Sequence, residues 1–147
     1  MTDETWPAWS PDGSRIAYAG TAGGSVDIWV MQADGSGKQR LTSGIEIETE
    51  PTWSPDGSTI AFRRTGGTTE IVLIAGSGGA ATPLALGGND RMPAWSPDGR
   101  LIAFARFPGG GGNPQLYTVH PDGTDIRLRT TDYTWNGGAH PAWIRGR

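Results

Sequence analysis

A motif of twelve residues is repeated along the chain, and it constrains the fold more than any other feature. The complete copies PAWSPDGSRIAY, PTWSPDGSTIAF and PAWSPDGRLIAF begin at Pro7, Pro51 and Pro93, and a broken copy, PAWIRGR, begins at Pro141. The copies therefore start 44, 42 and 48 residues apart. Periods in the low to middle forties are typical of four-stranded β-propeller blades. Helical repeats are disfavoured, because the 24 glycines and 11 prolines among 147 residues would interrupt their helices.

The same four strands can be placed in every repeat. The innermost strand is predicted over 6–10, 50–54 and 92–96, and the second over 15–19, 59–63 and 101–106. The third is predicted over 26–31, 70–75 and 115–119, and the fourth over 39–41, 82–86 and 126–129. No segment has a sustained helical period, so an all-β chain essentially without helix is expected.

These strands define a single repeat domain over 1–147. We place blade one over 6–42, blade two over 50–86, blade three over 92–130 and an extra inner strand over 141–147. The predicted fold class is a partial β-propeller of three four-stranded blades plus one extra C-terminal strand. Closed propellers have about 4–8 blades. Three alternatives therefore stay open: several chains complete the ring, the chain is a piece of a longer propeller, or the blades form an open arc.

Turn residues and tryptophans recur in register with the repeat. Ser-Pro-Asp-Gly at 10–13, 54–57 and 96–99 suits a tight turn between the first two strands, because proline fixes φ and glycine accepts a positive φ. We interpret the recurring Trp9, Trp53, Trp95 and Trp143 as packing between neighbouring blades. An aromatic ladder for sugars or bases is the alternative interpretation.

The pattern WSPDGxxIAF resembles the TolB-type, WD-like β-propeller repeat, over residues 7–147. The segments IWVMQADGSGKQRLT (28–42) and LYTVHPDGTDIRLRT (116–130) are also similar to that family, whereas IVLIAGSGGAATPLAL (71–86) departs from it. The resemblance implies a toroid, commonly of six blades, with roles in protein–protein contact. It also implies that such domains accompany some serine peptidases and carbohydrate-active enzymes, and it is compatible with a periplasmic or extracellular parent protein.

Several classes of chemistry find no support in the residues. The net charge is −3 and no basic stripe exists, so nucleic acid is not an expected partner. No apolar run approaches the length of a membrane span, and the first residues do not form a signal peptide. With no cysteine and two histidines, we expect neither a metal site nor a cofactor. No G-x-S-x-G elbow, P-loop or EF-hand loop occurs, so the chain is not expected to be an enzyme.

The varied loops at one end of the blades are the expected binding face. In blade geometry the loops between strands two and three, and the crossovers between repeats, share this end. Its candidate residues are Glu46, Glu48, Glu50, Arg63, Arg64, Asp90, Arg91, Tyr133, Trp135 and His140. Alternation places the three glutamates on one side of an extended segment, for a cation or basic partner, although we favour a solvated crossover. Trp135 either contacts a partner or covers the last blade's core.

We therefore expect a non-catalytic module for protein–protein interaction or scaffolding. The alternative is an accessory propeller that binds or gates the substrate of a larger peptidase or carbohydrate-active enzyme. The partner is a protein or the chain itself, and a homodimer would supply six blades. In such a dimer the extra strand 141–147 would compete for the place of the strand 6–10 of the next chain.

Overall fold

The computed structural model describes residues 4–109, 113–130 and 141–143, and its regular elements there are all β-strands, as predicted. They fall into three groups of four strands. Unit 1 contains β1 (Glu4–Trp9), β2 (Arg15–Ala22), β3 (Ser25–Gln32) and β4 (Gln39–Arg40). Unit 2 contains β5 (Ile47–Trp53), β6 (Thr59–Thr65), β7 (Thr69–Ala75) and β8 (Thr82–Pro83). Unit 3 contains β9 (Asn89–Trp95), β10 (Ile102–Phe107), β11 (Gln115–Val119) and β12 (Arg127–Leu128).

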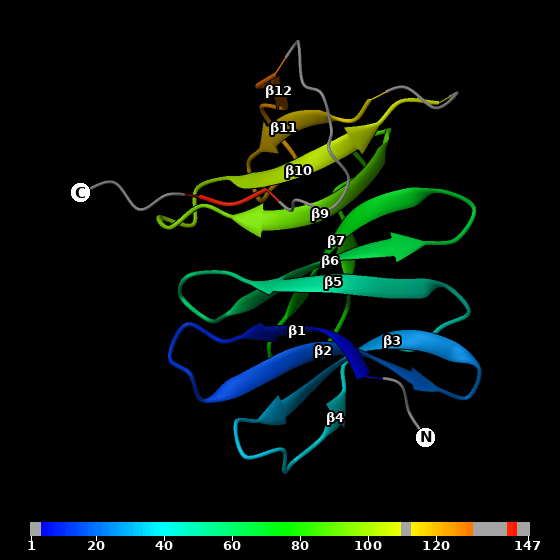
Figure 1. Ribbon diagram of the computed structural model, residues 1–147, viewed down its shortest axis with the longest axis vertical. Coiled ribbons are helices and arrows are strands. Elements are labelled where there is room, and N and C mark those ends of the chain that lie inside the picture. Colours follow the sequence, from blue (N-terminus) through cyan, green and yellow to red (C-terminus); the bar gives the residue numbers. More distant parts are fainter. Residues whose placement is uncertain (1–3, 110–112, 131–140, 144–147) are drawn as a thin grey trace.

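Each unit is an antiparallel sheet in which every strand pairs with the next one in the sequence. Units 1 and 2 are also joined by one parallel pair, Val26 with Ile47. The units are stacked along the long axis of the molecule, with unit 1 at one end and unit 3 at the other (Figure 1). Turns between the first two strands of each unit lie on one side of the stack, and the loops between β2 and β3 and between β6 and β7 lie on the opposite side.

The Ser-Pro-Asp-Gly turns are each closed by a set of local hydrogen bonds. In unit 1, the Ser10 hydroxyl donates to the Asp12 carboxylate at 2.6 Å and accepts the backbone N–H of Arg15 at 2.9 Å. The backbone N–H of Ser14 donates to the same carboxylate at 3.0 Å. Gly13 has a φ of 71°, which a side chain would disfavour. The serine and aspartate contacts recur in units 2 and 3, so the turn is a property of the motif.

A second recurring feature is a bulge in each innermost strand at the residue before the motif proline. Trp6, Glu50 and Met92 have φ values of 57°, 60° and 58°. A positive φ is uncommon outside glycine. The pairing register shifts at this point in β1, β5 and β9. The bulge changes which residues face each side of the strand, which simple alternation cannot predict.

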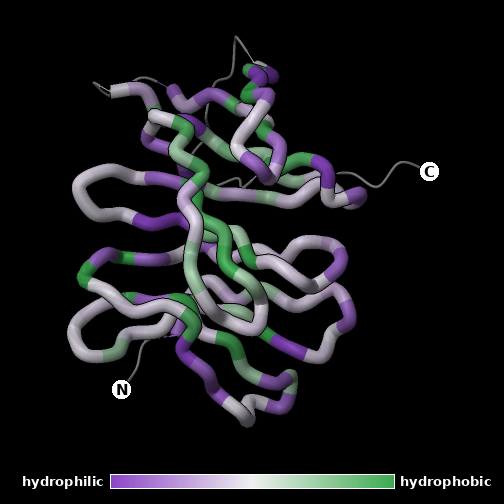
Figure 2. The backbone as a smooth tube through the Cα atoms, turned by 180° about the vertical axis from the view of Figure 1, so that it is seen from behind, coloured by the Kyte–Doolittle hydropathy of each residue, from purple (hydrophilic) through white to green (hydrophobic). Residues whose placement is uncertain are grey.

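The hydrophobic core consists of two layers, each between neighbouring units. The first layer contains Ala17, Ile28 and Val30 from unit 1 and Trp53, Ile60, Phe62, Val72 and Ile74 from unit 2. The second contains Ala61, Ile71, Leu84 and Leu86 from unit 2 and Ile102, Phe104 and Val119 from unit 3. Hydrophobic segments accordingly run through the middle of the stack, while many of the loops at its edges are coloured white or purple (Figure 2).

Three expectations about the elements need correction. The innermost strands begin earlier than predicted, at Glu4, Ile47 and Asn89, and the fourth strand of each unit has only two residues. Trp9 does not pack between sheets: its side chain is 59% exposed, because no unit among the described residues covers that side of unit 1. Of the expected strand 141–147, residues 141–143 are described, and they lie outside any strand.

Candidate interaction face

The loops at the two ends of the units differ in how much their sequences vary from unit to unit. The end with the Ser-Pro-Asp-Gly turns is nearly identical in all units. We call the opposite end the loop face; it comprises the described parts of the loops 23–24, 66–68 and 108–114 and of the crossovers 41–46 and 84–88. Most of the candidate residues lie on the strands that lead into these loops. Tyr133, Trp135 and His140 fall outside the described residues, so their predicted role is untested.

Buried ion pairs hold the loop-face ends of units 2 and 3. Arg64 Nε lies 2.9 Å from Glu48 Oε1, and the equivalent Arg106 Nε lies 2.7 Å from Asp90 Oδ1. Arg106 also donates from Nη2 to Asp90 Oδ2 at 2.9 Å and to the Leu86 carbonyl at 2.9 Å. The hydrogen bond to Asp90 is the main reason that the pKa of Arg106 is raised. The guanidinium groups stand 5.7 Å from the Phe62 ring and 5.5 Å from the Phe104 ring.

Unit 1 also has an acid–base ion pair at this place, but its cation comes from a different position in the unit. Gly20 occupies the position of Arg64 and Arg106, and the acid at the position of Glu48 and Asp90 is Glu4. Lys38, from the turn before β4, supplies the cation at 2.6 Å from Glu4. Burial, followed by the charge of Glu4, raises the pKa of the neighbouring Tyr18. Unlike its counterparts, this pair is exposed, with 48% and 36% of the two side chains accessible.

The acidic run is not the solvated crossover that we favoured. Glu48 and Glu50 are 4% and 5% exposed, because β5 begins at Ile47 and carries both into the interior. Glu50 Oε1 lies 2.8 Å from Arg63 Nη1, and Glu50 Oε2 accepts the backbone N–H of Met92 at 2.7 Å. Glu50 thus links units 2 and 3. Glu46 is half-buried, and among the described residues the three carboxylates do not form a group placed to hold a metal ion.

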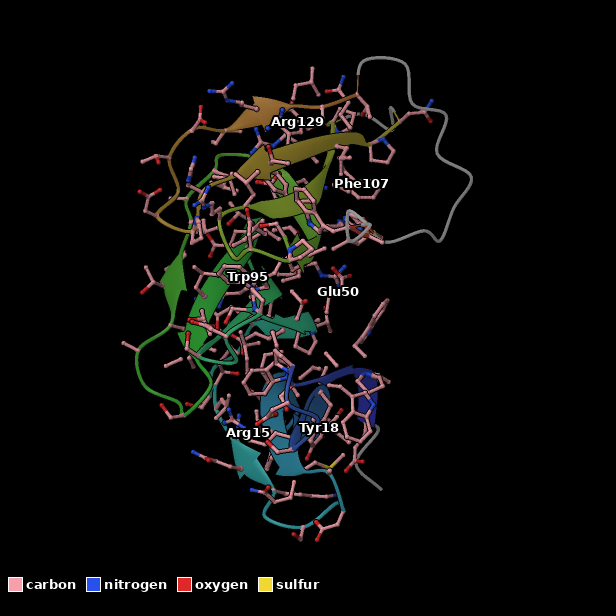
Figure 3. The ribbon with its side chains drawn as sticks, turned by 90° about the vertical axis from the view of Figure 1, so that its left-hand side faces the viewer. Arg15, Tyr18, Glu50, Trp95, Phe107 and Arg129 are labelled. Atoms are coloured by element: carbon pink, nitrogen blue, oxygen red, sulfur yellow. The ribbon has the colours of Figure 1, made fainter. Side chains whose placement is uncertain are left out.

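The remaining candidates are also engaged within the protein. Arg91 stacks on the ring of Phe107 at 4.6 Å and donates to the Asn89 side chain at 3.0 Å. Arg63 and Asp90 are in the ion pairs already described. Glu50 and Phe107 lie on the same side of the stack (Figure 3). The structure therefore brings these residues to one side, but it uses their charges mainly to join strands.

A hollow of about 830 Å³ opens on the loop face between units 2 and 3. Its rim includes Gly66, Gly67, Gly87, Gly88 and Gly109, and its polar side chains are Thr68, Thr69, Glu70, Asn89, Arg106 and Gln115. Sequence reasoning missed Glu70, the second residue of β7. The signal was a broken repeat: the equivalent Asp27 is paired with Arg40 at 2.7 Å, whereas Pro83 replaces that arginine in unit 2. Among the described residues, the half-buried Glu70 carboxylate has no hydrogen-bond or ion-pair partner.

Two further features of the described residues concern metal binding and membrane insertion. Within that part of the chain, no group of three or more histidine, aspartate or glutamate side chains is placed to hold a metal ion. No helix long and apolar enough to span a membrane occurs there either.

Comparison with known proteins identifies the repeat. A solved TolB-type protein of Agrobacterium tumefaciens superposes with a TM-score of 0.78 at 25% identity, covering 86% of this chain and 48% of that one. An oligogalacturonate lyase in complex with manganese gives a TM-score of 0.67 at 15% identity, over 83% of this chain and 40% of the lyase, which shows the fold alone. The Tol-Pal system protein TolB of Anaeromyxobacter dehalogenans is 60% identical over 35 residues.

These matches cover only part of the relatives. The aligned segment is 24% of this chain and 8% of the Anaeromyxobacter protein, and the chain spans about half of the Agrobacterium structure. The family model for the TolB beta propeller domain matches residues 3–110, most of the chain and all of units 1 and 2. On this evidence, the chain belongs to the TolB β-propeller domain family.

Proposed function

We propose that the chain is a non-catalytic protein-interaction or scaffolding module that contacts its partner through the loop face. Loops held by a rigid scaffold are the usual place for binding. The turn end is nearly identical in all three units, so it offers little that could distinguish one partner from another. The loop face differs from unit to unit and contains the hollow between units 2 and 3.

The observation that carries the proposal is the unpaired Glu70 carboxylate on the rim of this hollow. A half-buried carboxylate without a partner favours a positively charged group from outside the chain. The glycine-rich rim leaves backbone N–H and C=O groups accessible, because glycine has no side chain to cover them. The hollow therefore suits an extended polypeptide segment that places a lysine or arginine against Glu70.

Binding selection with displayed random peptides tests this proposal. The wild-type chain should enrich peptides with a basic residue, and Glu70→Gln should weaken their binding by at least about tenfold. Gln32→Lys is the matched control, because it changes the net charge by the same amount on the turn end and should leave binding intact. Failure to enrich basic peptides, or binding that survives Glu70→Gln, contradicts the proposed site.

The alternative function is an accessory propeller that binds or gates the substrate of a larger peptidase or carbohydrate-active enzyme. Its support is limited to the shared fold with enzymes such as the lyase. Enrichment of oligosaccharides instead of peptides would favour this alternative. Turnover of a peptide, ester or glycan substrate by the chain itself, abolished by mutating one of its residues, would contradict the non-catalytic assignment.

A further inference from the structure

The stack of units has two chemically different ends. In both core layers the later unit presents the same set of positions to the earlier one, and in unit 2 these are Trp53, Ile60, Phe62, Val72 and Ile74. The strand registers map them in unit 1 onto Trp9, Ile16, Tyr18, Trp29 and Met31. We call this set the leading face. We call the opposite surface of unit 3, which carries Arg129, the trailing face. Tyr18 and Arg129 lie near opposite ends of the stack (Figure 3).

The leading face is incompletely covered. Trp9 is 59% exposed, whereas Trp53 at the same motif position is 6% exposed. Ile16 and Met31 are half-buried, whereas Ile60 and Ile74 are buried. No hydrogen-bond acceptor for the Trp9 indole is found among the described residues. Trp29 is half-buried and Tyr18 is buried, so the accessible part of the face is centred on Trp9, and accessible apolar surface of this kind is typical of an association surface.

The described C-terminal residues 141–143, which we call the tail, contact the trailing face. Trp53 Nε1 donates to the Ala8 carbonyl of the preceding unit at 3.1 Å. Trp143 Nε1 donates to the Ala94 carbonyl of unit 3 at 3.0 Å, and Ala94 is the motif equivalent of Ala8. The indole of Trp95 departs from this series, since it is buried without an acceptor among the described residues. The indole of Trp143, in the PAW sequence 141–143 that is identical to 7–9, thus makes the contact that the motif tryptophan of a following unit would make.

We propose that two copies of the chain associate head to tail, with Trp9 of one copy displacing Trp143 from Ala94 of the other. Trp143 remains 36% exposed, so the tail covers its site less completely than Trp53 covers the site at Ala8. The leading face of a second copy brings Ile16 and Met31 together with Trp9, and it therefore buries more apolar surface than the tail. The tail is an intramolecular competitor that limits association.

Two features keep this association weak. A tethered competitor acts at an effective concentration of about 1 mM or more. In addition, Thr118 and Arg129 replace Val30 and Leu41 of unit 1 on the trailing face, and Arg129 Nε donates to Thr118 Oγ1 at 2.8 Å. The contact is therefore centred on Trp9 and Ala94, away from Arg129. It involves the ends of the stack and not the hollow, so it does not depend on the proposed function.

Sedimentation velocity of the 147-residue chain over a range of concentrations tests the proposal. Trp143→Ala should dimerise at a concentration at least about tenfold lower than the wild type, because the competitor is removed. Trp9→Ala should remain monomeric throughout, and Ile45→Ala is the control, since Ile45 is 95% exposed and away from both faces. Weaker dimerisation of Trp143→Ala would show that the tail is a clasp and overturn the proposal. Dimerisation of Trp9→Ala, or no dimer in either the wild type or Trp143→Ala, would overturn it as well.

Disulfide trapping identifies the faces in contact. A Cβ built on Gly57 would lie 3.7 Å from Pro11 Cδ of the preceding unit, and one on Gly99 would lie 3.3 Å from Pro55 Cγ. The equivalent pair across two copies is Gly13 and Pro97. The chain has no cysteine of its own. Gly13→Cys and Pro97→Cys, placed in separate copies with Trp143→Ala and mixed, should form a disulfide-linked heterodimer. Adding Trp9→Ala to the Gly13→Cys copy should abolish it, and no cross-link between natively folded copies contradicts the head-to-tail arrangement.

Discussion

Trp53 and Trp9 occupy the same place in the same motif, yet their surroundings differ. Trp53 sits between two units, with Arg15 of unit 1 stacked 4.5 Å over its ring and its indole bonded to Ala8. Trp9 begins the stack and is mostly exposed. The turns that follow the two tryptophans share the same serine and aspartate contacts. The motif therefore determines the turn, whereas the burial of its tryptophan depends on a preceding unit.

The largest expected effect tests this contrast. Trp53→Ala should lower the free energy of unfolding by about 3–5 kcal/mol, because it opens a cavity in the first core layer. Trp9→Ala should lower it by less than about 0.5 kcal/mol, the usual range for exposed positions. Urea unfolding at a concentration where the chain is monomeric measures both. Equal losses would mean that Trp9 is buried in solution.

This contrast also separates what the sequence predicts from what it does not. The repeated SPDG motifs predicted the four-stranded units and their turns, though not the exact strand ends, and the resemblance of WSPDGxxIAF predicted the family. The motifs were insufficient for the interior of the loop face, because a one-residue bulge at Glu50 reverses the alternation that the prediction assumed. Partners from distant strands then decide the burial of Glu48 and Asp90. The sequence did not single out Glu70, because what distinguishes it is the absence of a partner. Pro83 stands where unit 1 has the partner arginine, Arg40, and this repeat departs most from the family pattern.

Lys38 in unit 1 and Arg106 in unit 3 allow the same comparison between an exposed and an enclosed position for an ion pair. Arg106→Met should destabilise the chain by about 1–3 kcal/mol, since Asp90, 1% exposed, loses its partner while Arg106 itself is partly accessible. Lys38→Met should destabilise the chain clearly less than Arg106→Met, because the Lys38–Glu4 pair is exposed. Thermal unfolding at low and high salt separates the two. A similar loss in both variants would show that Gly20 and Lys38 recreate the full arrangement of unit 3.

Gly20 offers a smaller test of the same region. A Cβ there would lie 3.1 Å from Trp29 Cδ1 and 3.2 Å from Tyr18 Cε2, so Gly20→Ala should destabilise the chain by about 1 kcal/mol through overpacking. Gly67→Ala is the matched control, because no atom lies within 4 Å of its added Cβ. The control should be neutral or stabilising by up to about 1 kcal/mol, since alanine restricts the unfolded chain. Gly20→Ala without cost would mean that the Tyr18–Trp29 stack shifts freely at the exposed end.

The smallest expected effect concerns the turns. It tests whether a turn is stable without a neighbouring unit, whereas the burial of the motif tryptophan requires one. The Ser10 hydroxyl, followed by the backbone N–H of Ser14, lowers the pKa of Asp12 from 3.8 to about 2, and the equivalent contacts lower the pKa of Asp56. A lowered pKa in the folded state contributes stability that is fully present well above pH 3.8 and is lost as the pH falls towards about 2. The urea concentration at the unfolding midpoint should fall less steeply with decreasing pH over this interval in Asp12→Asn and in Asp56→Asn than in the wild type. Asp12 belongs to the unit at the exposed end and Asp56 to the enclosed unit. An equal change in the two variants would therefore mean that the turn is stabilised by its own residues. A larger effect for Asp56→Asn would show that the neighbouring unit supports the turn as well as the tryptophan.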